Sequence, residues 1–121
     1  MKINLRGKGI EITPAIHDYA TKKVESAGKF SKTNQEMIFE VSLEKTSNHH
    51  KEGDIFAVEI NTHIHGRPVV VRAQMEDMYA AIDKVKDELV HVLESEHKKH
   101  LTLFRRGGAK IKNMIKGLSG N

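Results

Sequence analysis

Cysteine and tryptophan are absent from this 121-residue sequence, and aromatic residues make up only 5% of it. Without cysteine, the chain can form no disulfide and offers no thiolate to a metal. No apolar run approaches the roughly 18 residues of a membrane-spanning helix. The start, Met1–Arg6, alternates polar and apolar residues and lacks the apolar core of a signal peptide. We therefore expect a cytoplasmic domain with an aliphatic core and no membrane association.

Acidic residues are absent from the C-terminal end. Residues 97–121 contain seven Lys or Arg and no Asp or Glu, whereas residues 1–96 contain 13 basic and 16 acidic side chains. A polyanionic partner would therefore meet mainly the C-terminal end. The pattern is equally typical of a solvated, flexible basic tail, so both interpretations stay open.

The sequence also lacks the signatures of common catalytic sites. It contains no G-x-S-x-G, no phosphate-binding glycine loop and no H-E-x-x-H. Its acidic residues stand mostly among lysines on predicted helix surfaces, as solvated charges do. We assign no catalytic residue and expect no enzymatic activity, small-molecule substrate or cofactor.

Eight histidines invite a test for a metal site. Zinc usually takes three or four protein ligands, and each local group supplies at most two. The groups lie in a predicted loop, on one face of a predicted strand and one turn apart on a predicted helix: His49 and His50, His63 and His65, and His97 and His100. The sequence therefore predicts no metal site.

Alternating and helical patterns define six elements. Residues 2–6, 37–44, 56–64 and 69–75 alternate apolar and polar residues and predict strands. Gly66 stands at a hairpin turn before the last of these. Thr13 and Pro14 are typical of a helix N-cap and first helical position, and Gly28 of the helix end.

The second helix begins after Asp77, a predicted N-cap. Its apolar residues recur at spacings of three and four and form one stripe: Met78, Ile82, Val85, Leu89, Val92 and Leu93. Gly107-Gly108 is expected to end this helix at the latest. Beyond it, Ile111, Met114, Ile115 and Leu118 predict a short amphipathic helix that is marginal on its own.

The order β-α-β-β-β-α predicts an α+β fold. Three later strands form an antiparallel meander, and two amphipathic helices cover the apolar face of a four-stranded sheet in a two-layer sandwich. We expect residues 1–104 to form this domain and residues 105–121 a basic, flexible tail.

Basic residues on the two helices are the candidate phosphate contacts. One side of the second helix, roughly opposite the apolar stripe, carries a basic residue or histidine every seven positions: Lys84, His91, Lys98 and Arg105. If the two helices lie side by side, their outer surfaces could form one basic platform that faces phosphates. The interleaved Asp87, Glu88 and Glu94 are typical of an ordinary solvated helix instead. With no exposed aromatic cluster expected, shape and phosphate contact with folded RNA would be the mode. The candidates are Lys22, Lys23, Lys29, Lys84, Lys86, His91, Lys98, Lys99, Arg105 and Arg106.

Two stretches carry a resemblance to a known family. Ile10–Ile16, with Tyr19 and Lys23 after it, and Glu76–Asp83 resemble the ribosome hibernation promoting factor and ribosome-associated inhibitor A family. The match covers roughly residues 1–100, and the Asp-Met-Tyr-Ala-Ala-Ile-Asp stretch is its most specific part.

The resemblance implies a fold similar to double-stranded-RNA-binding domains and a function. Members bind the small ribosomal subunit in the groove used by messenger RNA and tRNA, which inhibits translation in starved or stationary cells. Some pair idle ribosomes. The implied partner is ribosomal RNA, and the chain is expected to be a monomer off the ribosome. Long members carry a second, dimerising domain, so this chain resembles a short form with a basic extension or a long form cut in its linker; the short form is favoured.

The resemblance is uneven at the RNA-contacting positions. Lys23 and Lys99 match basic positions of the family. Elsewhere the family's usual cations are replaced, by His17, Ser26, Glu88, His91, Ser95 and His97. An alternative therefore stays open, in which the RNA surface has decayed and the 111–118 segment docks on a protein or an anionic membrane. Binding of free double-stranded RNA is a third reading, by fold analogy alone.

Overall fold

The computed structural model describes residues 1–47 and 53–119, and it describes side chains as far as Gly107 except that of Ser47. His49, His50 and the side chains of the predicted 111–118 stripe lie outside this description. The elements in chain order are β1 (Lys2–Lys8), α1 (Pro14–Gly28), η1 (Lys29–Ser31), β2 (Ile38–Ser47), β3 (Asp54–Ile64), β4 (Arg67–Met75) and α2 (Met78–Ser119).

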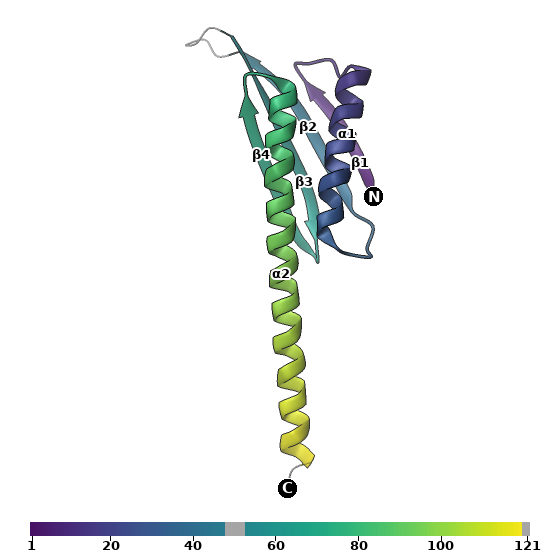
Figure 1. Ribbon diagram of the computed structural model, residues 1–121, viewed down its shortest axis with the longest axis vertical. Helices are drawn as coiled ribbons and strands as arrows, with labels where there is room; N and C mark the ends of the chain where they lie inside the picture. Colours follow the sequence, from purple (N-terminus) through teal and green to yellow (C-terminus); the bar gives the residue numbers. More distant parts are fainter. Residues whose placement is uncertain (48–52, 120–121) are drawn as a thin grey trace.

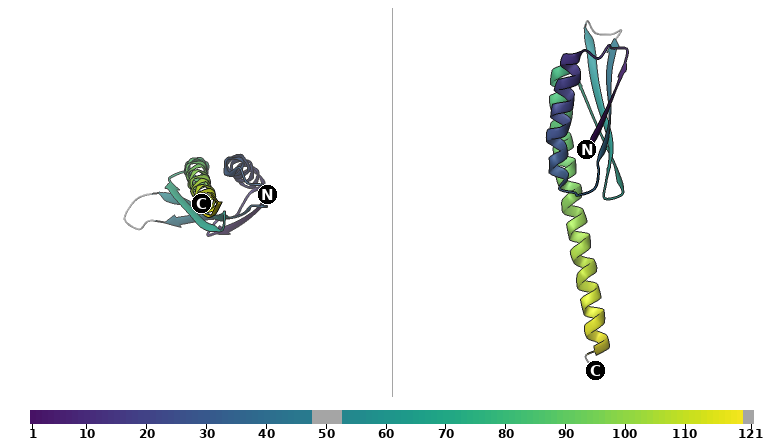
Figure 2. Two further views of the ribbon diagram at one scale, coloured as in Figure 1. Left: turned by 90° about the horizontal axis from the view of Figure 1, so that it is seen from below. Right: turned by 90° about the vertical axis from the view of Figure 1, so that its right-hand side faces the viewer.

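The four strands form one mixed sheet in the order β1-β2-β3-β4. β1 pairs parallel to β2, while β2, β3 and β4 form the predicted antiparallel meander. Both helices lie on one face of the sheet, side by side and running in the same direction (Figures 1 and 2). The predicted α+β two-layer sandwich is confirmed.

The core lies between the inner face of the sheet and the two helices. Phe39, Leu43 and Ile60 alternate with polar neighbours along their strands and are fully buried. From α2, Leu89 and Leu93 pack against them with no exposed surface. The predicted apolar stripe is therefore the part of α2 that holds the helix on the sheet.

Both predicted N-caps are formed. The Thr13 hydroxyl accepts a hydrogen bond from the backbone N–H of Ile16 at 3.2 Å. The Asp77 carboxylate accepts one from Ala80 N–H at 3.0 Å. Each satisfies one of the free N–H groups in the first helical turn. α1 ends at Gly28 as predicted.

The predicted end of the second helix is wrong, because α2 runs without a break to Ser119. Gly107 keeps a helical backbone and does not take the left-handed conformation of a helix-ending glycine. A glycine inside a helix costs only about 1 kcal/mol relative to alanine. Its neighbours Arg105, Arg106 and Ala109 favour helix, so two glycines do not stop it. In Figure 1 the C-terminal half of α2 projects past the sheet.

The β3–β4 hairpin turns through His65 and Gly66, with φ of 51° and 77°. Two positive φ values in a two-residue loop give the turn that fits the twist of paired strands. The prediction that His63 and His65 share a strand face is wrong, because β3 ends at Ile64. His63 is exposed opposite Pro68, whereas the turn sends the His65 ring toward α2.

Three imidazole rings therefore meet where the hairpin touches α2. The His65 and His100 rings stack with centroids 3.7 Å apart and planes 5° from parallel. His65 Nε2 lies 3.4 Å from His97 Nδ1. Burial lowers the pKa of His65, the neighbouring His100 and His97 lower it further, and Glu96 opposes them. The folded hairpin thus favours neutral His65.

The burial of α2 can be tested with two leucines of the same helix. Leu89→Ala should lower the free energy of unfolding by about 2–5 kcal/mol, because it leaves a cavity in the core. Leu103, which is 59% exposed, is the matched control. Leu103→Ala should change stability by about 0.5 kcal/mol or less. Urea unfolding followed by circular dichroism gives both values; equal losses would show that α2 is not held as described.

The His65 pKa shift predicts a pH dependence of stability. Since the unfolded chain takes up a proton at a higher pH than the folded chain does, stability should fall as the pH drops below about 6.5. His65→Asn should reduce this loss, because asparagine tolerates the left-handed turn and does not titrate. His63→Asn, on the exposed face, should leave the loss unchanged. Identical pH profiles for all three proteins would contradict the assignment.

Candidate nucleic-acid interface

A polar cluster joins the two helices. The Tyr19 hydroxyl of α1 donates a hydrogen bond to an Asp83 carboxylate oxygen of α2 at 2.6 Å. Lys23 Nζ lies 3.3 Å from the same oxygen and 5.3 Å from the centre of the Tyr19 ring. Tyr79 packs edge-on against Tyr19 with ring centres 5.0 Å apart. Four residues that carry the family resemblance thus form one cluster.

The ionisation of this cluster follows from its hydrogen bonds. The Tyr19 hydrogen bond lowers the pKa of Asp83, and Lys23 and Lys86 lower it further against the opposing effect of burial. Asp83 in turn raises the pKa of Tyr19 and of Lys23. The cluster therefore holds a charged Asp83 and a charged Lys23, so part of the positive charge of Lys23 is neutralised within the protein.

The first group of predicted phosphate contacts lies around this pair of helices. Lys86 is 24% exposed and reaches Asp87 at 3.8 Å. Lys22 and Lys84 are exposed on α1 and α2, and Lys29 is exposed just after α1. The solvent-exposed ammonium groups of these lysines are the parts that a ligand could contact.

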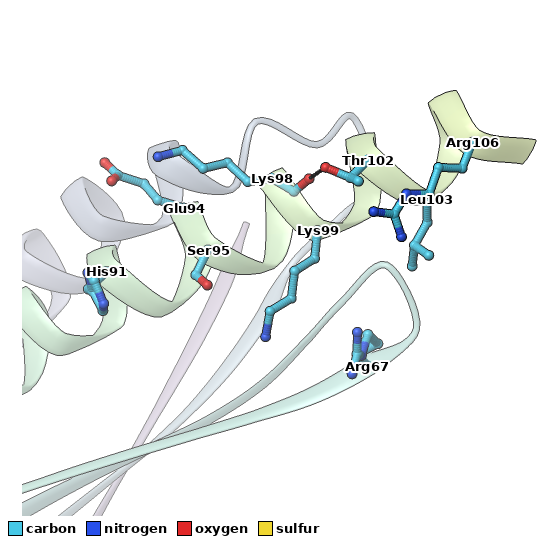
Figure 3. Close-up of a pocket in the computed structure, with 9 residues that line it drawn as sticks. All are labelled: Arg67, His91, Glu94, Ser95, Lys98, Lys99, Thr102, Leu103 and Arg106. Atoms are coloured by element: carbon cyan, nitrogen blue, oxygen red, sulfur yellow. Dashed lines mark hydrogen bonds between the residues drawn. The ribbon is translucent and has the colours of Figure 1, made fainter. Parts of the chain in front are cut away.

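The second group lines a groove beside the projecting part of α2 (Figure 3). The groove has a volume of about 510 Å³ and is bounded by α2 on one side and the hairpin on the other. Four of the predicted contacts line it, together with Arg67 from the first residue of β4. Its basic and histidine side chains are Arg67, His91, Lys98, Lys99 and Arg106.

Glu96 links the hairpin to α2 beside this groove through ion pairs. Its carboxylate lies 3.6 Å from Arg67 Nε and 3.5 Å from Lys99 Nζ, and its side chain is only 15% exposed. Arg67 is a site residue that sequence reasoning missed. It is the first residue of β4 and precedes the alternating pattern of residues 69–75, so the sequence pattern does not include it, and only the strand register brings it to α2.

The two groups do not merge into one uniform basic platform. Asp87, Glu88 and Glu94 lie on α2 between Lys84 and Lys98, as the sequence indicated. The interleaved carboxylates therefore divide the cations into those beside α1 and those beside the hairpin. Arg105 belongs with the second group by its place on the helix, and its side chain is exposed.

Aromatic exposure differs from the expectation. Phe104 is 74% exposed and Leu103 59% exposed, both on the projecting part of α2. No sequence pattern indicated this exposure, because the predicted domain extended to residue 104. Among the described residues, no helix is long and apolar enough to cross a membrane, and no three His, Asp or Glu side chains are arranged to hold a metal ion.

Comparison with curated proteins gives close matches over most of the chain. A ribosome hibernation promoting factor of Pseudomonas putida is 33% identical over 112 residues, which is 91% of this chain and 100% of that protein. One of Klebsiella oxytoca is 31% identical over 101 residues, 84% of this chain and 97% of that protein.

Solved structures with a similar fold match most of this chain. The N-terminal domain of Thermus thermophilus Protein Y superposes with a TM-score of 0.67 at 30% identity, covering 78% of this chain and 98% of that domain. A ribosomal subunit interface protein of Coxiella burnetii, at 23% identity and a TM-score of 0.58, shares the fold. The model of one family, described as Sigma 54 modulation protein / S30EA ribosomal protein, matches residues 3–101. The chain belongs to this family.

Proposed function

We propose that this protein is a ribosome hibernation factor that binds the small ribosomal subunit in the groove used by messenger RNA and tRNA. Family membership and relatives named for ribosome hibernation support the role. The proposed action is occlusion of that groove by a rigid domain in the cytoplasm, without catalysis. Bound there, the factor would keep idle ribosomes from starting translation.

The observation that carries the binding mode is the set of exposed cations beside the hairpin. Within residues 1–47 and 53–107, no carboxylate lies within ion-pair distance of Lys98, Arg105 or Arg106. By contrast, the other large surface, the outer face of the sheet, carries charges of both signs that partly pair, as in Arg72 with Glu44 at 3.6 Å. Unpaired cations on one element favour a polyanion.

The geometry of the groove suits a phosphate backbone. Arg67 approaches from the hairpin, while Lys99 and Arg106 approach from α2, so cations flank an open channel on two sides (Figure 3). Lys98 and the Glu94 carboxylate also line the groove. Neutralising roughly five phosphates makes an affinity fall steeply with salt. Such contacts position a protein on folded RNA without reading its sequence.

The α2 cations can be tested against an equal change of charge elsewhere. Changing Lys98, Lys99, Arg105 and Arg106 together to Ala should weaken ribosome binding at moderate salt by at least about 100-fold and reduce its salt dependence. The control changes Lys2, Arg6, Lys8 and Arg72 to Ala on the outer face of the sheet, removing the same charge. Cosedimentation with purified ribosomes measures both. Equal binding by the two variants would contradict the proposed surface.

Arg67 can be tested against another arginine of the same strand. Arg67→Ala should weaken ribosome binding several-fold and lower the slope of affinity against salt by about one phosphate contact. Arg72→Ala, on the outer face of β4, should leave both unchanged. Thermal unfolding of both variants controls for stability. If Arg67→Ala binds as the unmodified chain does, the hairpin side of the groove is not part of the interface.

A further inference from the structure

Arg67 is only loosely held by its ion pair with Glu96. It reaches the groove from the hairpin side (Figure 3), and its Nε lies 3.6 Å from the Glu96 carboxylate, which is longer than a hydrogen bond. That carboxylate oxygen is buried and accepts no hydrogen bond from any described residue. The Arg67 side chain is 57% exposed, and exposed ion pairs stabilise a structure little. Arg67 therefore needs a further contact to keep its place beside the groove.

The ring of His65, two residues before Arg67, makes a closer contact with α2. It stacks on the His100 ring with centroids 3.7 Å apart and planes 5° from parallel, so the two rings are in van der Waals contact. His65 Nε2 also lies 3.4 Å from His97 Nδ1. α2 is the helix that packs against β3 and β4. The His65 ring thus holds the tip of the hairpin on α2.

The turn couples the position of this ring to that of Arg67. Only Gly66 separates His65 from Arg67, and Ile64 pairs with Arg67 across the loop. Both loop residues have positive φ, a conformation that leaves a two-residue loop little freedom. A His65 ring that leaves α2 therefore takes Arg67 away from the groove.

The charge of His65 decides whether the ring stays on α2. Burial lowers the pKa of His65, and the neighbouring His100 and His97 lower it further. Glu96 acts in the opposite direction, but its carboxylate is already paired with two cations. A proton on His65 is consequently more stable when the ring has left α2 for water.

We propose that His65 is a positioning residue of the phosphate groove, whose neutral ring holds Arg67 in place and whose protonation releases it. The inference rests on the proposed function and adds a dependence on pH to it. Arg67 contributes to ribosome binding at neutral pH and ceases to contribute at acidic pH. The cations of α2 keep their places on the helix at either pH, so the effect is confined to the hairpin side of the groove.

The test is cosedimentation of the full chain with ribosomes at about pH 7.5 and about pH 5.5, on either side of the ordinary histidine pKa of about 6.5. Variants are compared at the same pH, which cancels the titration of other groups. Arg67→Ala should weaken binding several-fold at the higher pH and less than about twofold at the lower pH. Combined with His65→Asn, which suits the turn but has no ring and does not titrate, it should add less than about twofold at both.

His63→Asn is the matched control, because it makes the same substitution two residues earlier on the exposed face of β3. Combined with it, Arg67→Ala should keep its full effect at the higher pH and lose it at the lower pH. Equal weakening by Arg67→Ala at both pH values in the unmodified chain would overturn the proposal. So would a several-fold effect of Arg67→Ala in the His65→Asn background, since the ring would then not position Arg67.

Hydrogen exchange follows the hairpin without ribosomes. After correction for the intrinsic effect of pH, exchange of the hairpin amides should speed up from about pH 7.5 to about pH 5.5 in the unmodified chain and in His63→Asn. In His65→Asn it should be fast at both pH values. Equal protection of the hairpin at both pH values in the unmodified chain would overturn the positioning role.

The two measurements separate this proposal from the proposed function. If the unmodified chain binds ribosomes but the effect of Arg67→Ala does not depend on pH, the role of His65 is wrong and the hibernation function stands. If the chain binds no ribosomes at low salt, the proposed function fails, and hydrogen exchange alone decides whether His65 holds the hairpin.

Discussion

The burial of one face of α2 on the inner face of the sheet is the contact on which the rest of the molecule depends. Leu89 and Leu93 have no exposed surface where they pack against the buried side chains on the inner face of the sheet. Burying one leucine contributes about 1.5–3 kcal/mol, so the five buried positions of the stripe fix the helix firmly. With α2 fixed, α1 aligns beside it, and Asp83 can meet Tyr19 and Lys23. The hairpin end then meets α2 at Glu96.

The same contact explains where the candidate interface lies. A helix of 42 residues is about 63 Å long, whereas the 11-residue strand β3 spans about 37 Å. The helix therefore leaves the sheet with part of its length uncovered. It leaves at the hairpin, where Arg67 and the His65 ring reach it. The cations on the uncovered part of α2 are therefore accessible to a ligand.

Much of the fold could be predicted because its signals are local. Thr13 and Asp77 are both followed by helical patterns, and each forms the cap that its position indicated. The alternation of apolar and polar residues predicted both the antiparallel meander and the sheet face that the helices cover. The end of α2 could not be predicted, because a glycine pair permits a helix end without requiring one, and Gly107 stays helical. The boundary at residue 104 and the tail's behaviour stay predictions.

The candidate site was less predictable because it is made by turn geometry and strand register. The left-handed backbone at His65 turns its ring from the strand face toward His100, and no sequence pattern shows this. Arg67 reaches Glu96 only because β3 and β4 pair in one register. The helix cations were found from their spacing, yet their division into two groups depends on where α1 and the hairpin lie. Their contact with RNA stays a prediction.

We propose that this domain binds ribosomes through salt-sensitive phosphate contacts. The most direct measurement is cosedimentation of the unmodified chain with purified ribosomes and separated subunits through sucrose gradients at low and moderate salt. The account predicts binding to the small subunit and the intact ribosome that weakens steeply as salt rises. A peak of paired ribosomes would show that the protein also pairs ribosomes. Absence of binding at low salt, or binding that salt does not weaken, would contradict the account.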